Sequence, residues 1–196
     1  MGETRALTDG DADLAAAAGS LGVDLVALAA RTAIWVHPEV VRTLAARRPD
    51  AEWFPATRRA FATRGEARRG VVDGVKLDDN TAANLAIKQA VFEGAAAACR
   101  NYACCHVWPE SCRDPRCHTS LANLTLVPRA LAGLTDHDAA VGAALRRRSY
   151  DLYGWTPPGL PPPPVPAVYP PPAGWRAPIE PGPAVWRRVA RKIAAA

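Results

Sequence analysis

Four side chains between residues 106 and 137 have the types and order of a hydrolytic site. His106 ends a short apolar segment, Asn123 follows seventeen positions later, and His137 stands beside Asp136. An imidazole near its ordinary pKa of about 6.5 can accept a proton at neutral pH. Carboxylates and imidazoles are also side chains that bind divalent cations. A base close to a bound cation predicts metal-assisted hydrolysis of a phosphodiester bond.

The order of these residues resembles that of the HNH, or His-Me finger, endonucleases. Residues 102–138 carry a histidine at the end of one apolar run, an asparagine at the start of the next, and a histidine in the segment that follows. The resemblance implies a ββα-metal core in which His106 is the general base and Asn123 fixes the imidazole or its loop. It also implies His137 and Asp136 as metal ligands, Mg²⁺ or Mn²⁺ as the cofactor, and nucleic acid, DNA in particular, as the substrate.

Two positions depart from the common pattern of that family. Cys105 stands directly before the base, where the family often has an aspartate ligand. Ala132 stands nine positions after Asn123, where the last histidine is usual, and His137 lies fourteen positions after it. His118, five residues before Asn123, is an alternative ligand for the same cleft. Because a thiolate prefers softer ions than Mg²⁺, Zn²⁺ stays a candidate metal.

The cysteines offer a competing interpretation. All five lie between residues 99 and 117, and this odd, crowded set suits a reducing compartment better than a disulfide framework. A tetrahedral zinc site has four candidate ligands: Cys104 or Cys105, Cys112, Cys117 and His118. Such a site would hold the loop between the two apolar runs without any catalysis. The alternative function is therefore a zinc-stabilised module that binds nucleic acid or protein.

Hydrophobic periodicity predicts the elements that would position these side chains. The pattern favours helices near residues 21–31 and 38–48. A longer helix is expected over residues 78–98, because Asp78-Asp79-Asn80-Thr81 offers short oxygen-bearing side chains for its first free amides. Residues 50–76 mix aromatics, arginines and glycines, a composition that predicts a binding loop.

Two short apolar runs, residues 102–107 and 121–127, predict the strands of a hairpin. Pro128 fits the first turn of a short helix that ends at Leu134, and Thr135 or Asp136 would cap a further helix through Tyr150. The predicted fold is α+β, a mostly helical domain with a small ββα-metal core. Its expected parts are an N-terminal helical portion (1–99), the HNH-like core packed on it (100–156), and a proline-rich linker with a basic helix (157–196).

The last of these parts differs in composition and in charge. It holds 13 of the 19 prolines, a density that favours an extended polyproline conformation. Beyond them Trp186, Val189 and Ile193 recur at helical spacing opposite a basic face. This pattern predicts a short amphipathic helix that docks on the domain or on a partner protein, with anionic lipid and nucleic acid as alternatives. The part carries five Arg and Lys and one Glu, which leaves about +1 of the net charge of +5 for the rest of the chain.

A nearly neutral body must bind nucleic acid through local cations. Arg129, which begins the segment after the second strand, and Arg146, in a run of three arginines, are the expected phosphate contacts. The chain shows no basic and apolar leader and no apolar run long enough to cross a bilayer, so we expect a cytoplasmic protein without a transmembrane segment. A third class of function, a scaffold that recruits partners through the tail, would need no site at all.

Overall fold

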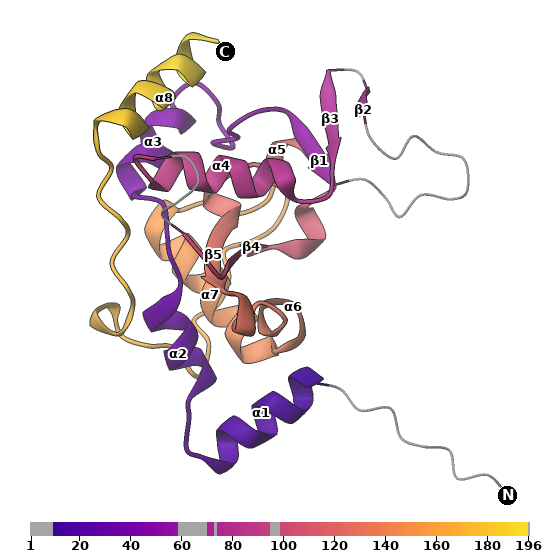
Figure 1. Ribbon diagram of the computed structural model, residues 1–196, viewed down its shortest axis with the longest axis vertical. Coiled ribbons are helices and arrows are strands. Elements are labelled where there is room, and N and C mark those ends of the chain that lie inside the picture. The colour runs from indigo at the N-terminus through magenta and orange to yellow at the C-terminus, as the bar shows by residue number, and fades with distance from the viewer. Residues whose placement is uncertain (1–9, 59–69, 73, 95–98, 196) are drawn as a thin grey trace, which may run out of the picture.

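The computed structural model describes residues 10–58, 70–72, 74–94 and 99–195. The α-helices are α1 (Gly10–Ser20), α2 (Leu25–Thr32), α3 (Pro38–Ala45), α4 (Thr81–Val91), α5 (Pro115–His118), α6 (Leu134–His137), α7 (Ala139–Tyr153) and α8 (Pro183–Ala194). Short 3₁₀ helices are η1 (Pro109–Ser111), η2 (Leu121–Asn123), η3 (Arg129–Leu131) and η4 (Pro172–Gly174). The strands are β1 (Ala56–Arg58), β2 (Gly70–Val72), β3 (Val75–Asp78), β4 (Tyr102–His106) and β5 (Leu124–Pro128). The predicted α+β class is confirmed (Figure 1).

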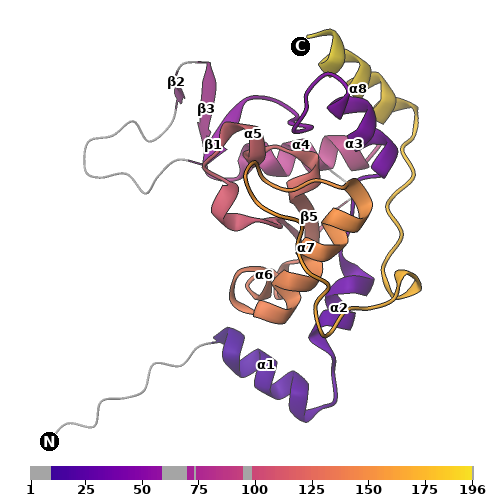
Figure 2. The same cartoon turned by 180° about the vertical axis from the view of Figure 1, so that it is seen from behind.

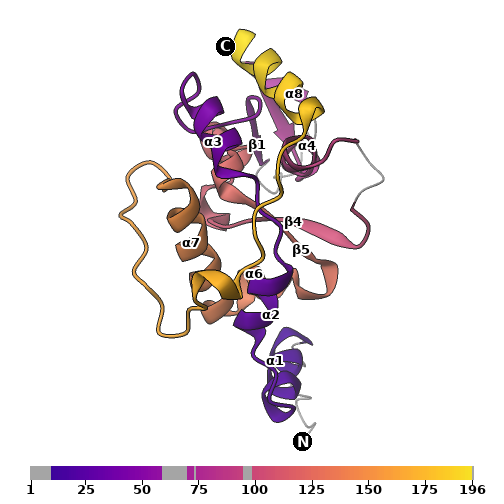
Figure 3. The same cartoon turned by 90° about the vertical axis from the view of Figure 1, so that its left-hand side faces the viewer.

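The β4–β5 hairpin lies between two hydrophobic clusters (Figures 1 and 3). Its antiparallel register runs from the pair Tyr102–Pro128 to the pair His106–Leu124. Successive side chains of a strand point to opposite faces. Leu124 and Leu126 therefore pack into the cluster formed with α3, α4 and α8, whereas Val127 packs into the cluster formed with α2, α6 and α7. Each face of the hairpin is covered by a different group of helices.

Helix α4 covers the face of the hairpin that carries His106. The helix was expected to run from about residue 78 to 98, but it begins at Thr81 and ends at Val91. The predicted capping is confirmed, because the Asp78 carboxylate, three residues before the helix, accepts from the Ala82 amide. The neighbouring Asn80 turns the chain with φ 113° and donates its side-chain amide to the Cys104 carbonyl, 2.9 Å away. This turn ties the start of α4 to β4.

The segment after the hairpin differs from the expected pair of helices. Pro128 is the last residue of β5, and a 3₁₀ turn follows it in place of a helix that reaches Leu134. The following α7 is capped by Asp138, whose carboxylate accepts from the Ala140 and Val141 amides, both 2.9 Å away. The helix ends at Gly154, which takes a left-handed conformation with φ 64°. Figure 2 shows α7 lying across the hairpin.

A second, three-stranded sheet lies beside the loop of the hairpin and was not predicted. Strand β3 is central, with β1 parallel and β2 antiparallel to it. These strands fall within the region expected to form a binding loop, and residues 59–69 of that region lie outside the described residues. The short strands escaped prediction because three or four residues are too few to show an alternating pattern.

The C-terminal part packs against the body at several points along its described length. Figure 1 shows it leaving α7, passing along the molecule and ending in α8 beside α3 and α4. Trp175 lies in one hydrophobic cluster, and Val185 and Val189 lie in the other. The core therefore includes residues beyond position 156.

Among the described residues no single helix is long and apolar enough to cross a bilayer, although α1 and α2 meet that test when taken together as one sharply bent pair.

Candidate histidine site and its surroundings

His106 is the last residue of β4 and points toward the start of α4, away from α7. Its side chain is nearly buried, with 5% of its surface exposed. The Nε2 atom lies 2.9 Å from the carbonyl oxygen of His118. A carbonyl only accepts hydrogen bonds, so Nε2 must carry the proton in the neutral ring, and Nδ1 keeps the lone pair. The backbone thus fixes both the orientation and the tautomer of this imidazole.

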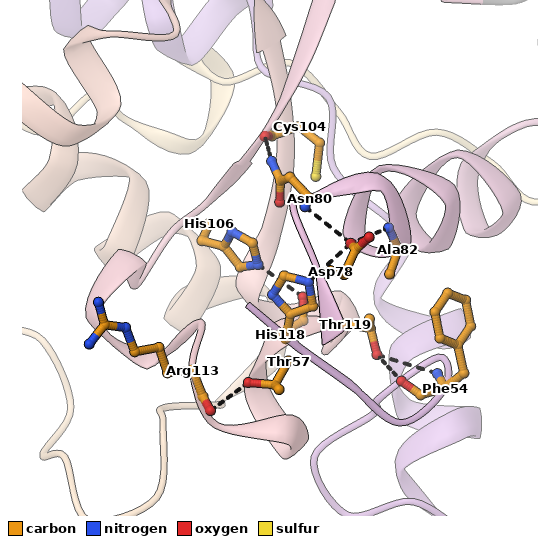
Figure 4. A network of polar contacts seen from close by, with 10 residues as sticks. All are labelled: Phe54, Thr57, Asp78, Asn80, Ala82, Cys104, His106, Arg113, His118 and Thr119. Carbon is orange, nitrogen blue, oxygen red and sulfur yellow. Dashed lines mark hydrogen bonds and ion pairs between the residues drawn. The ribbon is translucent and has the colours of Figure 1, made fainter. Parts of the chain in front are cut away.

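His118 is the second imidazole of the site. It ends the one-turn helix α5, is completely buried, and stacks on the His106 ring with 5.0 Å between ring centroids. Its Nε2 lies 3.4 Å from Oδ2 of Asp78 (Figure 4). The same carboxylate oxygen accepts from the amides of Asn80 and Ala82 at the start of α4. Two histidines from the hairpin loop therefore meet a carboxylate anchored by another helix.

Burial sets the protonation states of this cluster. Desolvation, the neighbouring His118 and the Arg58 guanidinium lower the pKa of His106 to about 4, against the opposing effect of its hydrogen bond. Desolvation also lowers the pKa of His118, although the contact with Asp78 opposes this shift. Burial alone would raise the pKa of Asp78, but its hydrogen bonds from Ala82, His118 and Asn80 outweigh burial and lower it. At neutral pH the site holds two uncharged imidazoles and one carboxylate.

Asn123 holds the loop that carries both histidines. Its Oδ1 accepts from the Trp108 amide at 2.9 Å, and its Nδ2 donates to the Cys117 carbonyl and to Ser111 Oγ, each 3.0 Å away. The side chain is completely buried, so each of these bonds satisfies a group that water does not reach. The loop-fixing contact that the resemblance implied for Asn123 is present, and it acts on the residues that flank the two imidazoles.

The second sheet brings a cation to the site. Strand β1 is joined to the loop by the Arg58 amide, which donates to the Cys112 carbonyl at 2.9 Å, and by Thr57 Oγ1, which donates to the Arg113 carbonyl at 2.6 Å. The exposed Arg58 side chain lies close enough to lower the pKa of both imidazoles. From the sequence, Arg58 stood out only among the arginines of residues 50–76, and Asp78 only as a capping residue. No local signal connects either of them to His118, because the contacts join residues 40 or more positions apart.

No protein-family model, curated protein or solved structure matches this chain. The resemblance of residues 102–138 to the HNH endonucleases therefore rests on the residue pattern alone.

The structure does not bring the helix-borne ligand candidates to His106. Strand alternation turns Cys105 to the face opposite His106, where its thiol lies beside Thr135 and Asp136 of α6. His137 ends the same helix and is exposed to solvent. The residue that His106 meets is His118, which was predicted on or near the second strand and lies instead in α5.

The described residues form no group of three or more His, Cys, Asp or Glu side chains that could hold a metal ion. All five cysteines are free, and Cys104 and Cys105 point to opposite faces of β4. Burial, opposed by Thr135, raises the pKa of Cys105 to about 11, and burial with the nearby Asp114 and Asp50 raises the pKa of Cys117 to about 12. Protonated thiols are poor metal ligands. As arranged, these side chains do not fit the predicted Mg²⁺, Mn²⁺ or Zn²⁺ sites.

The two arginines predicted to bind phosphate have different surroundings. Arg129 begins η3 beyond the hairpin and its side chain is exposed. Arg146 is held in place by the Val107 carbonyl at 3.2 Å and the Glu110 carboxylate at 3.3 Å, and it stacks over the Trp108 ring. Arg129 is thus free to approach a ligand from solvent, whereas Arg146 mainly braces the start of the hairpin loop.

Proposed function

We propose that this chain is an endonuclease of the HNH type that hydrolyses phosphodiester bonds, in DNA above all, with His106 as the general base. The observation that carries the proposal is the state of the His106 ring. It stands at the end of the first hairpin strand, it is uncharged at neutral pH, and a backbone carbonyl 2.9 Å away fixes the proton on Nε2. Nδ1 therefore has the lone pair that a general base needs.

In the proposed reaction Nδ1 of His106 accepts a proton from the water that attacks phosphorus, the P–O bond to the leaving oxygen breaks, and that oxygen takes a proton from solvent. General-base catalysis of this kind contributes about 10²- to 10⁴-fold in rate. The guanidinium of Arg58 stands on the exposed side of the site and offsets charge that develops on the phosphate oxygens. His118 and Asp78 position the base from behind, since the His118 carbonyl is the acceptor that orients it. A phosphate that approaches the imidazole favours its protonated form, which strengthens it as a base during the reaction.

The test is a nicking assay on supercoiled plasmid, run with Mg²⁺, with Mn²⁺ and with EDTA. We expect the wild-type protein to nick the plasmid, and we expect H106A to nick it at least 10²-fold more slowly. H37A removes a histidine of α3, outside the site, and serves as the matched control with wild-type activity. Loss of nicking in EDTA would show that cleavage needs a divalent cation, for which the described side chains form no ligand group. Equal nicking by H106A and wild type would contradict the proposal.

A second candidate function is a nucleic-acid- or protein-binding module without catalysis. Two observations favour it: the described residues assemble no metal-ligand group, and both imidazoles are almost fully buried. A module of this kind would bind oligonucleotide without cleaving it under any of the three conditions. H106Q would then leave its affinity unchanged.

A further inference from the structure

Helix α8 is locked onto the end of α4 by reciprocal capping. The Arg188 guanidinium donates to the carbonyls of Gln89, Phe92 and Glu93, which are free at the C-terminus of α4. In return the Glu93 carboxylate accepts from the Ala184 amide in the first turn of α8, at 3.1 and 3.2 Å from its two oxygens. Val185 and Val189 are buried beneath this contact. The helix is therefore a fixed element with a defined outer face.

Among the described residues, α8 presents cations beside α4, and no acid lines the same pocket. A pocket of about 390 Å³ lies between α8 and α4. The described residues that line it are Gln89, Arg188, Arg191, Lys192 and Ala195, so three are cations and none is acidic. Burial, Arg48 and Arg191 together lower the pKa of Lys192, which shows that the amino group lies in a field of like charge. An anion in this pocket would relieve that repulsion.

Lys192, one of the residues that line the pocket, also contacts two aromatic rings near the histidine site. The Lys192 amino group lies 5.6 Å from the centroid of the Trp53 ring and 5.1 Å from that of Phe54. The Phe54 backbone exchanges two hydrogen bonds with the hydroxyl of Thr119, the residue after His118 (Figure 4). Along α4, Gln89 lies eight residues after Thr81, a rise of about 12 Å. The pocket and the histidines thus flank the same stretch of α4.

We infer that the α8 pocket, with Arg191 and Lys192 as its free cations, binds a backbone phosphate of the nucleic acid whose scissile bond lies at His106. This inference rests on the proposed function. At a rise of ~3.4 Å per nucleotide along one strand, about three or four nucleotides separate the two positions. A groove lined by cations is typical of surfaces that follow a nucleic-acid backbone. The pocket fixes the register of the strand, and Arg188 is a positioning residue that holds α8 in place.

The test measures binding by fluorescence anisotropy with a labelled DNA duplex, over salt from about 50 to 200 mM. All proteins carry H106Q, so that no turnover occurs. The double variant R191Q/K192Q should weaken binding on the order of tenfold and reduce the slope of log affinity against log salt by about 0.9, the value for one lost phosphate contact. The control R31Q/R176Q removes the same charge from exposed arginines outside α8 and should leave the slope within about 0.5 of its starting value.

The outcomes separate this inference from the proposed function. An unchanged slope in R191Q/K192Q overturns the inference while leaving nicking by His106 intact. A reduced slope with no nicking by the wild-type protein supports the phosphate site and rejects the catalytic proposal. Binding of phosphatidylglycerol vesicles that depends on Arg191 and Lys192, with no binding of DNA, assigns the pocket to a lipid surface and also overturns the inference. Equal losses in R191Q/K192Q and R31Q/R176Q would show general attraction by net charge and would reject a defined site.

Discussion

The His106 imidazole is the side chain on which the proposed chemistry of this chain depends. The sequence predicted that it and Asn123 belong to one site, because the order of the hairpin residues resembles that of the HNH endonucleases. It did not reveal Asp78 or Arg58, since their places depend on how α4 and β1 pack on that loop. The sequence also placed His137 with His106, but the alternation of β4 turns His106 away from α6. The sequence therefore indicated site residues within the hairpin, but not the contacts between elements that are distant along the chain.

The depressed pKa of His106 predicts a pH-dependent stability. Between the unfolded value of 6.5 and the folded value of about 4, the unfolded chain binds a proton that the folded chain excludes. Stability therefore rises with pH through this window and falls as the pH drops from 6.5 to 4. The full loss is about 3 kcal/mol, at about 1.4 kcal/mol per pKa unit. Urea unfolding from pH 4.5 to 7.5 should show this slope in the wild type and a shallower slope in H106Q. Parallel slopes would contradict the assignment.

The contacts of Asp78 predict that a small substitution there will strongly lower the free energy of unfolding. D78N removes the charge that His118 and two backbone amides contact in a buried setting. Because hydrogen bonds to a charged group each contribute about 1.5–3 kcal/mol, we expect D78N to lower the free energy of unfolding at pH 7 by about 3 kcal/mol. The exposed neighbour gives the control D79N, with an expected change within about 0.5–1 kcal/mol. Equal effects of the two variants in urea unfolding would show that Asp78 has no special role.

At the scale of elements, the hairpin and the loop that it encloses make the site. The predicted strands lie close to β4 and β5, because apolar runs between turn residues are a strong signal. The start of α4 was also close to prediction, whereas its end came seven residues early, since Phe92 leaves the helix in an extended conformation. The sheet β1–β3–β2 could not be predicted, because its pairing depends on contacts with the loop and not on its own pattern.

Substitutions at Asn123 test whether its side-chain hydrogen bonds stabilise that loop. N123A leaves the Trp108 amide without its acceptor in the interior, at a cost of about 1–3 kcal/mol, and removes one donor from the Cys117 carbonyl, which still accepts from the Ser120 amide. N123D keeps the acceptor for Trp108 and loses the donor for Cys117, so we expect an intermediate loss of stability. Hydrogen exchange should speed up at the Trp108 amide in N123A and less in N123D. If exchange at Trp108 is unaltered in N123A, the loop does not depend on this anchor.

At the scale of the whole molecule, the C-terminal part completes the core. Composition alone predicted an extended proline-rich segment and a basic helix with a docking face, and α8 does pack on α3 and α4. The sequence could not show where that face would dock, because an amphipathic pattern specifies a buried side and not a partner. The position of α8 is fixed by the reciprocal caps of Arg188 and Glu93, which join segments that are distant in the sequence.

A substitution at Val189 measures how much the docking of α8 contributes to the free energy of unfolding. V189A removes two methyl groups that are almost fully buried between α8 and the body, so we expect a loss of about 2 kcal/mol in the free energy of unfolding. V165A is the matched control, because Val165 is 63% exposed and its truncation should change stability by less than about 0.5 kcal/mol. Thermal unfolding compares the two directly. A V189A protein as stable as V165A would mean that α8 is a loose appendage.

The most direct test of the central claim is the pH profile of DNA cleavage at subsaturating substrate, where the rate reports the ionisation of the free enzyme. The wild-type rate should stay level from about pH 5.5 to 8, because the free base has a pKa of about 4, and H106Q should be slower by at least 10² throughout. A rate that rises tenfold per pH unit through pH 6.5, or cleavage by H106Q at the wild-type rate, would contradict the assignment of the buried His106 as the base.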